Sequence, residues 1–168
     1  DRSEFRLPPH DPSAFDNEPL RPYNAGPDAL LTNFKSLRLT LVPDTATRTV
    51  VAVVDTPVDD IRVDARLQYA DGACGDWREK LVVGITGNAL SLSGAFAGNC
   101  GEKALHVSPW PANLQVEQLF RALWKELGGS FSGRVRDGEA PPAARVLLTH
   151  ESPPLAEAVR DVNKWSNN

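Results

Sequence analysis

Strict alternation of apolar and polar residues is clearest between residues 61 and 69. Charged or amide side chains fill the positions between the apolar ones, which are Ile61, Val63, Ala65, Leu67 and Tyr69. Because successive side chains of a strand point to opposite faces, this pattern predicts a strand with one buried and one solvated face. Asp71-Gly72, directly after it, is typical of a turn.

Further segments have strand patterns. The pattern turns to strand from residue 29 to residue 41, with alternating leucines at its end. Thr49–Val54 is an unbroken run that is mostly β-branched, which predicts a strand buried on both faces. Residues 81–85 and 90–96 predict a hairpin, since the Gly-Asn pair between them suits a tight turn. Two shorter strands are expected at residues 130–135 and 145–149.

The helical pattern is strongest from residue 114 to residue 127. Asn113 can cap this helix and Gly128-Gly129 can end it. Its apolar positions form a wide stripe that we expect to lie in the core: Val116, Leu119, Phe120, Leu123, Trp124 and Leu127. A final short helix is expected to start at Ser152-Pro153-Pro154, which offers a cap and a first-turn proline, and to carry apolar residues along one face.

Composition narrows the class of protein. The 168 residues are 41% hydrophobic and 24% charged, as in a soluble globular protein. The net charge of −4, with dispersed acidic residues, argues against nucleic-acid binding. No apolar run approaches the roughly 20 residues of a membrane-spanning helix. Because the chain contains no methionine, we expect it to be an internal piece of a longer protein.

Cys74 and Cys100 are the two cysteines, and each lies in a glycine-bearing loop. They could be two unrelated buried thiols. However, the predicted hairpin lies between them, so both loops can meet at one end of it and a disulfide is the favoured interpretation. It would stabilise the fold by roughly 3–4 kcal/mol and indicate a compartment outside the cytoplasm.

Several kinds of site are excluded by spacing. Neither phosphate-binding glycine motif occurs, and the three histidines (His10, His106 and His150) do not pair at metal-ligand spacing, so we expect no cofactor and no metal. The remaining candidate is Ser166-Asn167-Asn168, which has the Ser-x-Asn form of one motif of serine acyl-enzymes. Taken alone, this triplet is better explained as a helix end or cap followed by a loop.

The order of the motifs adds a family resemblance. Asp1-Arg2-Ser3-Glu4-Phe5, residues 22–30 (PYNAGPDAL), the cysteine-bearing lobe, the helix before Gly128-Gly129, and residues 154–168, which end in NKWSNN, follow one another along the chain. In this order the chain resembles the class C low-molecular-mass penicillin-binding proteins. These are periplasmic, serine-type D-alanyl-D-alanine carboxypeptidases and endopeptidases.

The resemblance implies an acyl-enzyme that acts on peptidoglycan stem peptides and is inhibited by β-lactams. Ser166 would relay a proton, and Asn168 would orient the catalytic lysine and bind the substrate. Asp1 would bind the free amino group of a diamino acid, with Phe5 as its neighbour. The nucleophile motif Ser-x-x-Lys and the motif Lys-Thr-Gly do not occur in the chain, so we expect it to be inactive alone.

The expected fold class is α+β, with a mixed sheet, one long amphipathic helix and a β-rich inserted lobe, as part of a multidomain penicillin-binding protein. Residues 1–48 and 109–142 would form an inserted domain, and residues 49–108 a lobe nested in it. Residues 143–168 would return to a transpeptidase-like domain. The alternative function is a non-catalytic secreted module that binds cell wall or another protein.

Overall fold

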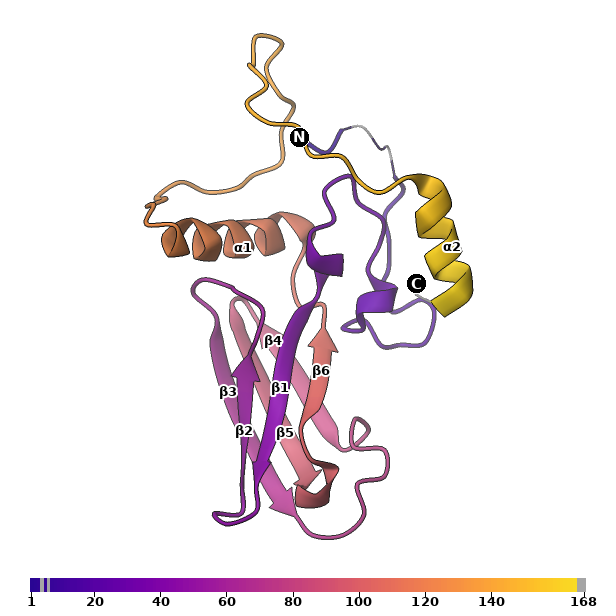
Figure 1. Cartoon of the computed structure of the whole chain (residues 1–168), viewed down its shortest axis with the longest axis vertical. Helices are drawn as coiled ribbons and strands as arrows, with labels where there is room; N and C mark the ends of the chain where they lie inside the picture. Colours follow the sequence, from indigo (N-terminus) through magenta and orange to yellow (C-terminus); the bar gives the residue numbers. More distant parts are fainter. Residues whose placement is uncertain (4, 6, 166–168) are drawn as a thin grey trace.

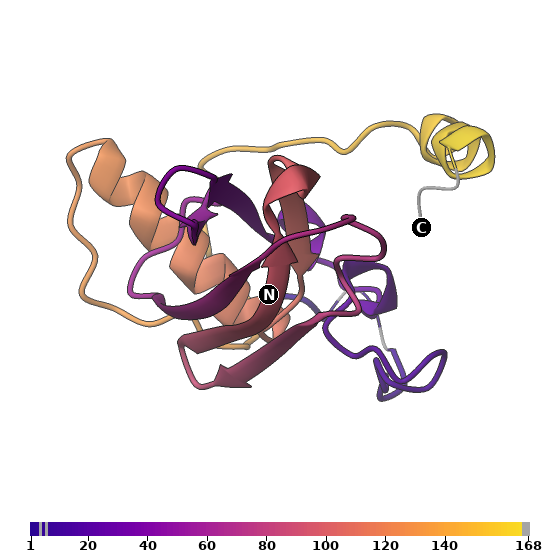
Figure 2. The ribbon, with the colours of Figure 1, turned by 90° about the horizontal axis from the view of Figure 1, so that it is seen from below.

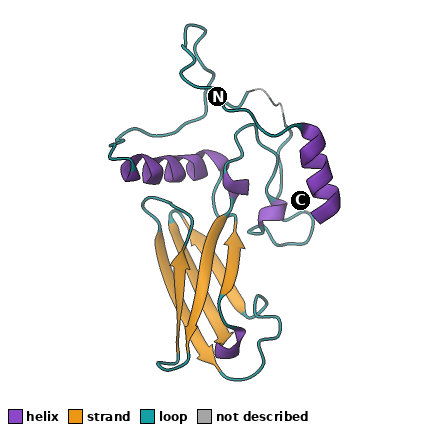
Figure 3. Cartoon of the chain, in the orientation of Figure 1, coloured by secondary structure: helices purple, strands orange, loops and turns teal. Residues whose placement is uncertain are grey.

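The computed structural model describes residues 1–3, 5 and 7–165, and its strands form two sheets that face each other (Figures 1 and 3). One sheet contains β1 (Leu37–Asp44), β2 (Thr49–Val54) and β6 (Lys103–Val107). The other contains β3 (Arg62–Ala70), β4 (Leu81–Thr86) and β5 (Ala89–Ala97). The helices are α1 (Ala112–Glu126) and α2 (Leu155–Trp165), with short 3-10 turns at Pro22–Asn24, Asn33–Lys35 and Gly98–Cys100.

Each sheet is built around a central strand. In the first sheet β1 runs antiparallel to both neighbours, and Leu39 lies opposite Val54 and Leu105. In the second, β5 runs antiparallel to β4 but parallel to β3, so this sheet is mixed. The α+β class with a mixed sheet is therefore confirmed. The predicted hairpin of residues 81–96 is also present, with Gly87 at positive φ in its turn.

The core lies between the two sheets. The three alternating leucines of β1 are fully buried, as the pattern predicted, and they meet the inward faces of β5 and β6. Trp77 packs edge-on against Phe96, with ring centroids 5.8 Å apart. β1 lies before residue 49, where the sequence suggests a boundary between the inserted domain and its nested lobe. It nevertheless pairs with β2 and β6, which lie after that boundary.

The structure corrects the prediction that β2 is buried on both faces. Its side chains alternate, and Val51 and Val53 are about half exposed. β2 is an edge strand, and in the described structure its outer face is uncovered. A β-branched run indicates a strand, but it does not show whether another layer packs against each face of that strand. The predicted strand from residue 29 was also wrong at its beginning, because residues 33–35 turn with positive φ and β1 starts at Leu37.

Helix α1 is present, but it presents a different face from the one predicted. It lies across the ends of the two sheets (Figure 1) and buries Ala112, Gln115 and Gln118. The predicted core residues Trp124 and Leu127 are instead 44% and 81% exposed. The reason is the location of the helix, because backbone polar groups emerge at strand ends and amide-bearing side chains can meet them.

Two contacts show how this polar face is used. The side-chain Nε2 of Gln115 lies 3.5 Å from the carbonyl oxygen of Ser36, and the backbone carbonyl of Gln118, not its side chain, accepts a hydrogen bond from the Asp59 N–H. The predicted cap was also wrong. Asn113 lies inside the helix, while Pro111 occupies the cap position without a side-chain hydrogen bond.

The two short strands predicted after α1 do not form in the described structure. For residues 130–135, side chains of α1 take the backbone groups that a ladder would use. Arg121 binds the carbonyls of Phe131 and Gly133, and Glu117 accepts the N–H of Val135. Residues 145–149 are exposed coil, since no described strand lies beside them to pair with their backbone.

Helix α2 lies apart from the sandwich, beyond the long segment that follows α1 (Figure 2). The predicted helix is present, but it begins at Leu155, after both prolines, rather than with a proline in its first turn. Leu155 and Val159 on its apolar face are 78% and 48% exposed. The sandwich and α1 therefore form the packed part of the described chain.

The predicted disulfide is present. Cys74 precedes β4 and Cys100 follows β5, and their Cα atoms lie 4.9 Å apart at the open end of the hairpin. Both strands of the hairpin are thus joined at each end, by the turn at Gly87 and by the disulfide.

Candidate functional site

Ser166 and Asn168, the predicted catalytic residues, lie outside the described residues. Their roles stay predictions. The other predicted site residues, Asp1 and Phe5, lie in the N-terminal segment, which meets residues 137–140 near the chain's start (Figure 1).

The Asp1 carboxylate is held by three hydrogen bonds. Its Oδ1 accepts from the Ser3 backbone N–H at 2.9 Å and from Ser3 Oγ at 2.7 Å. Its Oδ2 accepts from the Ala140 N–H at 2.7 Å. These donors are neutral, so they fix the orientation of the carboxylate without neutralising its charge.

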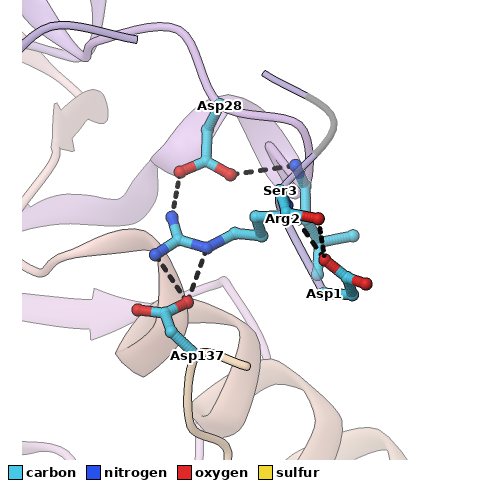
Figure 4. A network of polar contacts seen from close by, with 6 residues as sticks. Asp1, Arg2, Ser3, Asp28 and Asp137 are labelled. Carbon is cyan, nitrogen blue, oxygen red and sulfur yellow. Dashed lines mark hydrogen bonds and ion pairs between the residues drawn. The ribbon is translucent and has the colours of Figure 1, made fainter. Parts of the chain in front are cut away.

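Arg2 lies between two further carboxylates (Figure 4). Its Nε and Nη2 donate to Asp137 Oδ1 at 2.8 and 2.7 Å, and its Nη1 pairs with Asp28 Oδ2. The hydrogen bond to Asp137, followed by the attraction of Asp28, raises the pKa of Arg2 above its ordinary value. Arg2 therefore bridges two segments that are far apart in sequence while remaining charged.

Asp28 is held in place by a hydrogen bond of its own. Its other oxygen accepts the Leu30 N–H at 2.9 Å, and its side chain is only 15% exposed. Asp137 is more open, with its side chain 58% exposed. The Arg2 guanidinium thus links Asp28, whose side chain is nearly buried, to the exposed loop that carries Asp137.

A cavity of about 540 Å³ opens beside this cluster. Phe5, which is 58% exposed, and Leu7 supply apolar surface. Asp28, Asp137 and Glu139 supply carboxylates, and Arg2 supplies the cation among the described residues that line the cavity, which do not include Asp1. A cavity with an excess of carboxylates and an apolar wall suits a cationic group on an aliphatic chain.

Sequence reasoning did not find the roles of Arg2, Asp28 and Asp137. Asp137-Gly138 has the signature of a turn, and Arg2 is 135 residues away from it in sequence. No local pattern connects such distant charges. The local sequence gives no charge signal either, because Asp28 is an isolated acid and Asp137 and Glu139 follow Arg134 and Arg136.

A second cavity, of about 690 Å³, lies between α1 and the ends of β1 and β6. Ser36 Oγ lies 3.3 Å from His106 Nδ1 there. Burial lowers the pKa of His106, and the charges of Arg38 and Arg78 lower it further. Asp55 is engaged by Arg38 at 3.3 Å. Among the described residues no carboxylate is bonded to His106, so the pair does not form a catalytic triad.

Within the described ranges, no three His, Cys, Asp or Glu side chains are grouped in a way that could hold a metal ion. The same residues include no helix long and apolar enough to cross a membrane.

The fold has counterparts among solved structures. Penicillin binding protein 4 (dacB) from Haemophilus influenzae is similar over 92% of this chain, with a TM-score of 0.68 and 20% identity. The same protein complexed with a novel beta-lactam matches 77% of the chain, with a TM-score of 0.54 and 19% identity. The chain covers 34% and 30% of those two chains, about a third of their length.

The sequence model of the D-Ala-D-Ala carboxypeptidase 3 (S13) family matches residues 1–168. The chain therefore belongs to this family. No curated protein sequence matches it significantly. The resemblance to low-molecular-mass penicillin-binding proteins is thus confirmed at the level of the family.

Proposed function

We propose that the chain is part of a periplasmic serine-type D-Ala-D-Ala carboxypeptidase and endopeptidase that acts on peptidoglycan stem peptides. The observation that carries this proposal is the match of the family model to all of residues 1–168. The disulfide between Cys74 and Cys100 supports a compartment outside the cytoplasm.

In the proposed reaction, an activated serine attacks the terminal D-Ala-D-Ala peptide bond, and water then releases the acyl-enzyme. Ser166 relays a proton between the catalytic lysine and the leaving amine. Asn168 hydrogen-bonds the substrate peptide and orients the lysine. The nucleophile and that lysine are not supplied by this chain, because it contains neither Ser-x-x-Lys nor Lys-Thr-Gly.

Incubation with a fluorescent penicillin tests the catalytic part. The 168-residue chain alone should stay unlabelled. The same chain expressed with the flanking sequence of its gene should form a covalent adduct, and Ser166→Ala should slow the formation of that adduct. Labelling of the isolated chain, or no labelling with the flanks present, would contradict the proposal.

The charge and shape of the N-terminal site support a role in substrate recognition. We infer that Asp1 binds the side-chain amine of the diamino acid in the stem peptide, with Phe5 against its aliphatic part. An ammonium is a cation, and among the described residues the donors that orient the Asp1 carboxylate are neutral. A charge-assisted hydrogen bond of this kind contributes roughly 1.5–3 kcal/mol.

Asp1→Asn tests this role because it keeps the shape and removes the charge. We expect the variant to bind a stem peptide with a free amine about tenfold more weakly, and to bind the amine-acetylated peptide as the wild type does. Equal losses for both peptides would show that Asp1 does not bind the amine.

A further inference from the structure

We propose that Arg2 is a positioning residue that keeps Asp1 available as the amine-binding carboxylate of this site. The inference rests on the proposed role of Asp1. In Figure 4 the Arg2 guanidinium lies between the carboxylates of Asp28 and Asp137, while Asp1 lies at the other end of Arg2, next to Ser3.

The first step is the distribution of charge. Arg2 pairs with Asp28 and Asp137, so one guanidinium compensates two neighbouring carboxylates. Asp1 accepts hydrogen bonds only from neutral groups in the described part of the chain. Of these three carboxylates, Asp1 is thus the one to which the described residues supply no cationic side chain, so it can take an ammonium.

The second step is the position of Asp1. Its Oδ2 depends on the N–H of Ala140, three residues after Asp137. By fastening Asp137, Arg2 fixes the loop that supplies this N–H, and by fastening Asp28 it ties the loop to a nearly buried anchor. The orientation of Asp1 therefore depends on Arg2 through the loop, although the guanidinium of Arg2 bonds to Asp28 and Asp137 and not to Asp1.

The third step is the choice of side chain. Arginine has a planar fork of donors, and here its Nε and Nη2 hold Asp137 while its Nη1 holds Asp28. Lysine would keep the positive charge but present it as a single point. A change to lysine therefore separates the geometry of the fork from its charge.

Substitution of Arg2 distinguishes a positioning role from a purely electrostatic one. Loss of the Arg2 charge makes the cavity more negative, so a purely electrostatic effect would tighten the binding of an amine. Positioning predicts weaker binding, because the loop at Ala140 is released and two unpaired carboxylates compete with Asp1 for the ammonium. The two effects have opposite signs.

The test uses the 168-residue chain and the N-acetylated tripeptide L-Ala-γ-D-Glu-meso-diaminopimelate, with its side-chain amine either free or acetylated. Calorimetry gives the ratio of the two affinities, and the amide NMR signal of Ala140 reports the hydrogen bond to Asp1. The variants are Arg2→Gln, Arg2→Lys and Asp1→Asn. Arg66→Gln is the control, since Arg66 also pairs with an aspartate on the surface.

We expect the wild type and Arg66→Gln to prefer the free amine by about tenfold. Arg2→Gln and Arg2→Lys should lower that preference to threefold or less and shift the Ala140 signal in the same direction as Asp1→Asn does. Unchanged far-ultraviolet circular dichroism would show that the variants are folded.

The possible failures are distinguishable. If Asp1→Asn removes the preference but both Arg2 variants keep it, the positioning role is wrong and the role of Asp1 stands. If Arg2→Gln strengthens the preference, Arg2 acts by charge alone and the inference is overturned. If the wild type shows no preference for the free amine, the role of Asp1 fails, and the inference fails with it.

Discussion

Cys74 and Cys100 lie on opposite flanks of one hairpin, with their Cα atoms 4.9 Å apart. They close the end of the hairpin that lacks a turn, and Cys100 is itself part of the core together with Trp77 and Phe96. The disulfide thus joins the loops next to β4 and β5, two strands of one of the two sheets. Its removal should affect the whole fold rather than a single loop.

Replacement of both cysteines by serine should lower the free energy of unfolding by about 3–4 kcal/mol, because the unfolded chain then regains the entropy of an open loop. Urea unfolding followed by tryptophan fluorescence measures this change. Reductant should have the same effect on the wild type and none on the variant. An unchanged midpoint for the double variant would show that the disulfide contributes nothing to stability.

Gly94 in β5 has a backbone conformation that other residues rarely adopt. Its φ is +121°, and a Cβ added there would overlap the backbone carbonyl of Lys80. Gly94→Ala should therefore destabilise the fold by about 3 kcal/mol or more, through backbone strain together with displacement of β4.

Gly72 provides the matched control for this substitution. Its φ is also positive, at +98°, but an added Cβ would meet no atom within 4 Å. Gly72→Ala should therefore cost only the conformational strain, about 1 kcal/mol. Chemical denaturation of both variants gives the comparison, and equal losses would mean that the contact with Lys80 is unimportant.

The parts of the fold that the sequence predicted are those with a local signal. Alternation identified β1 and β3, and the Gly-Asn turn identified the β4–β5 hairpin. The helical period also identified α1, but period alone does not say which face has a neighbour. Gln118 is buried and Leu127 is exposed because α1 crosses the strand ends, and that placement depends on the tertiary structure.

The candidate site likewise depends on contacts that a local sequence pattern does not indicate. Asp1 and Phe5 were predicted as site residues from one short motif, whereas Arg2 meets Asp137 across 135 residues. Likewise, residues 145–149 have a strand pattern, but a pattern cannot supply the neighbouring strand that a ladder requires. Contacts between distant segments were therefore the part that could not be predicted.

The contrast between the two faces of the first sheet can be measured. Leu39 is fully buried on the inner face, whereas Val53 is 46% exposed on the outer face. Leu39→Ala should cost about 2–5 kcal/mol, because it leaves a cavity between the sheets. Val53→Ala should cost less than about 1 kcal/mol in the same urea experiment. A large loss for Val53→Ala would indicate that the outer face of β2 is covered in solution.

Glu117 connects α1 to the segment that follows it, and its protonation should weaken this connection. The backbone N–H of Val135 and then the side chain of Arg121 lower the pKa of Glu117. The relevant distances are 2.8 Å from Val135 N to Oε2 and 2.9 Å from Arg121 Nη2 to Oε1.

The sign of the pH dependence follows from this lowered pKa. A carboxyl whose pKa is lower in the folded state stabilises the fold above the pKa of the unfolded chain, which is near 4.5. This contribution is lost as the pH falls through the folded-state pKa. Unfolding free energies measured in urea between pH 7 and pH 3 should therefore decrease more steeply for the wild type than for Glu117→Gln.

Glu126→Gln is the control, because Glu126 is an exposed glutamate on the same helix. It removes an equal charge but should leave the steepness of the wild-type curve unchanged. Glu117→Gln should also be less stable than the wild type at pH 7, since a neutral amide binds Arg121 more weakly than a carboxylate does. If Glu117→Gln and Glu126→Gln gave parallel curves, the contacts of Glu117 with Val135 and Arg121 would not contribute to the stability of the folded chain.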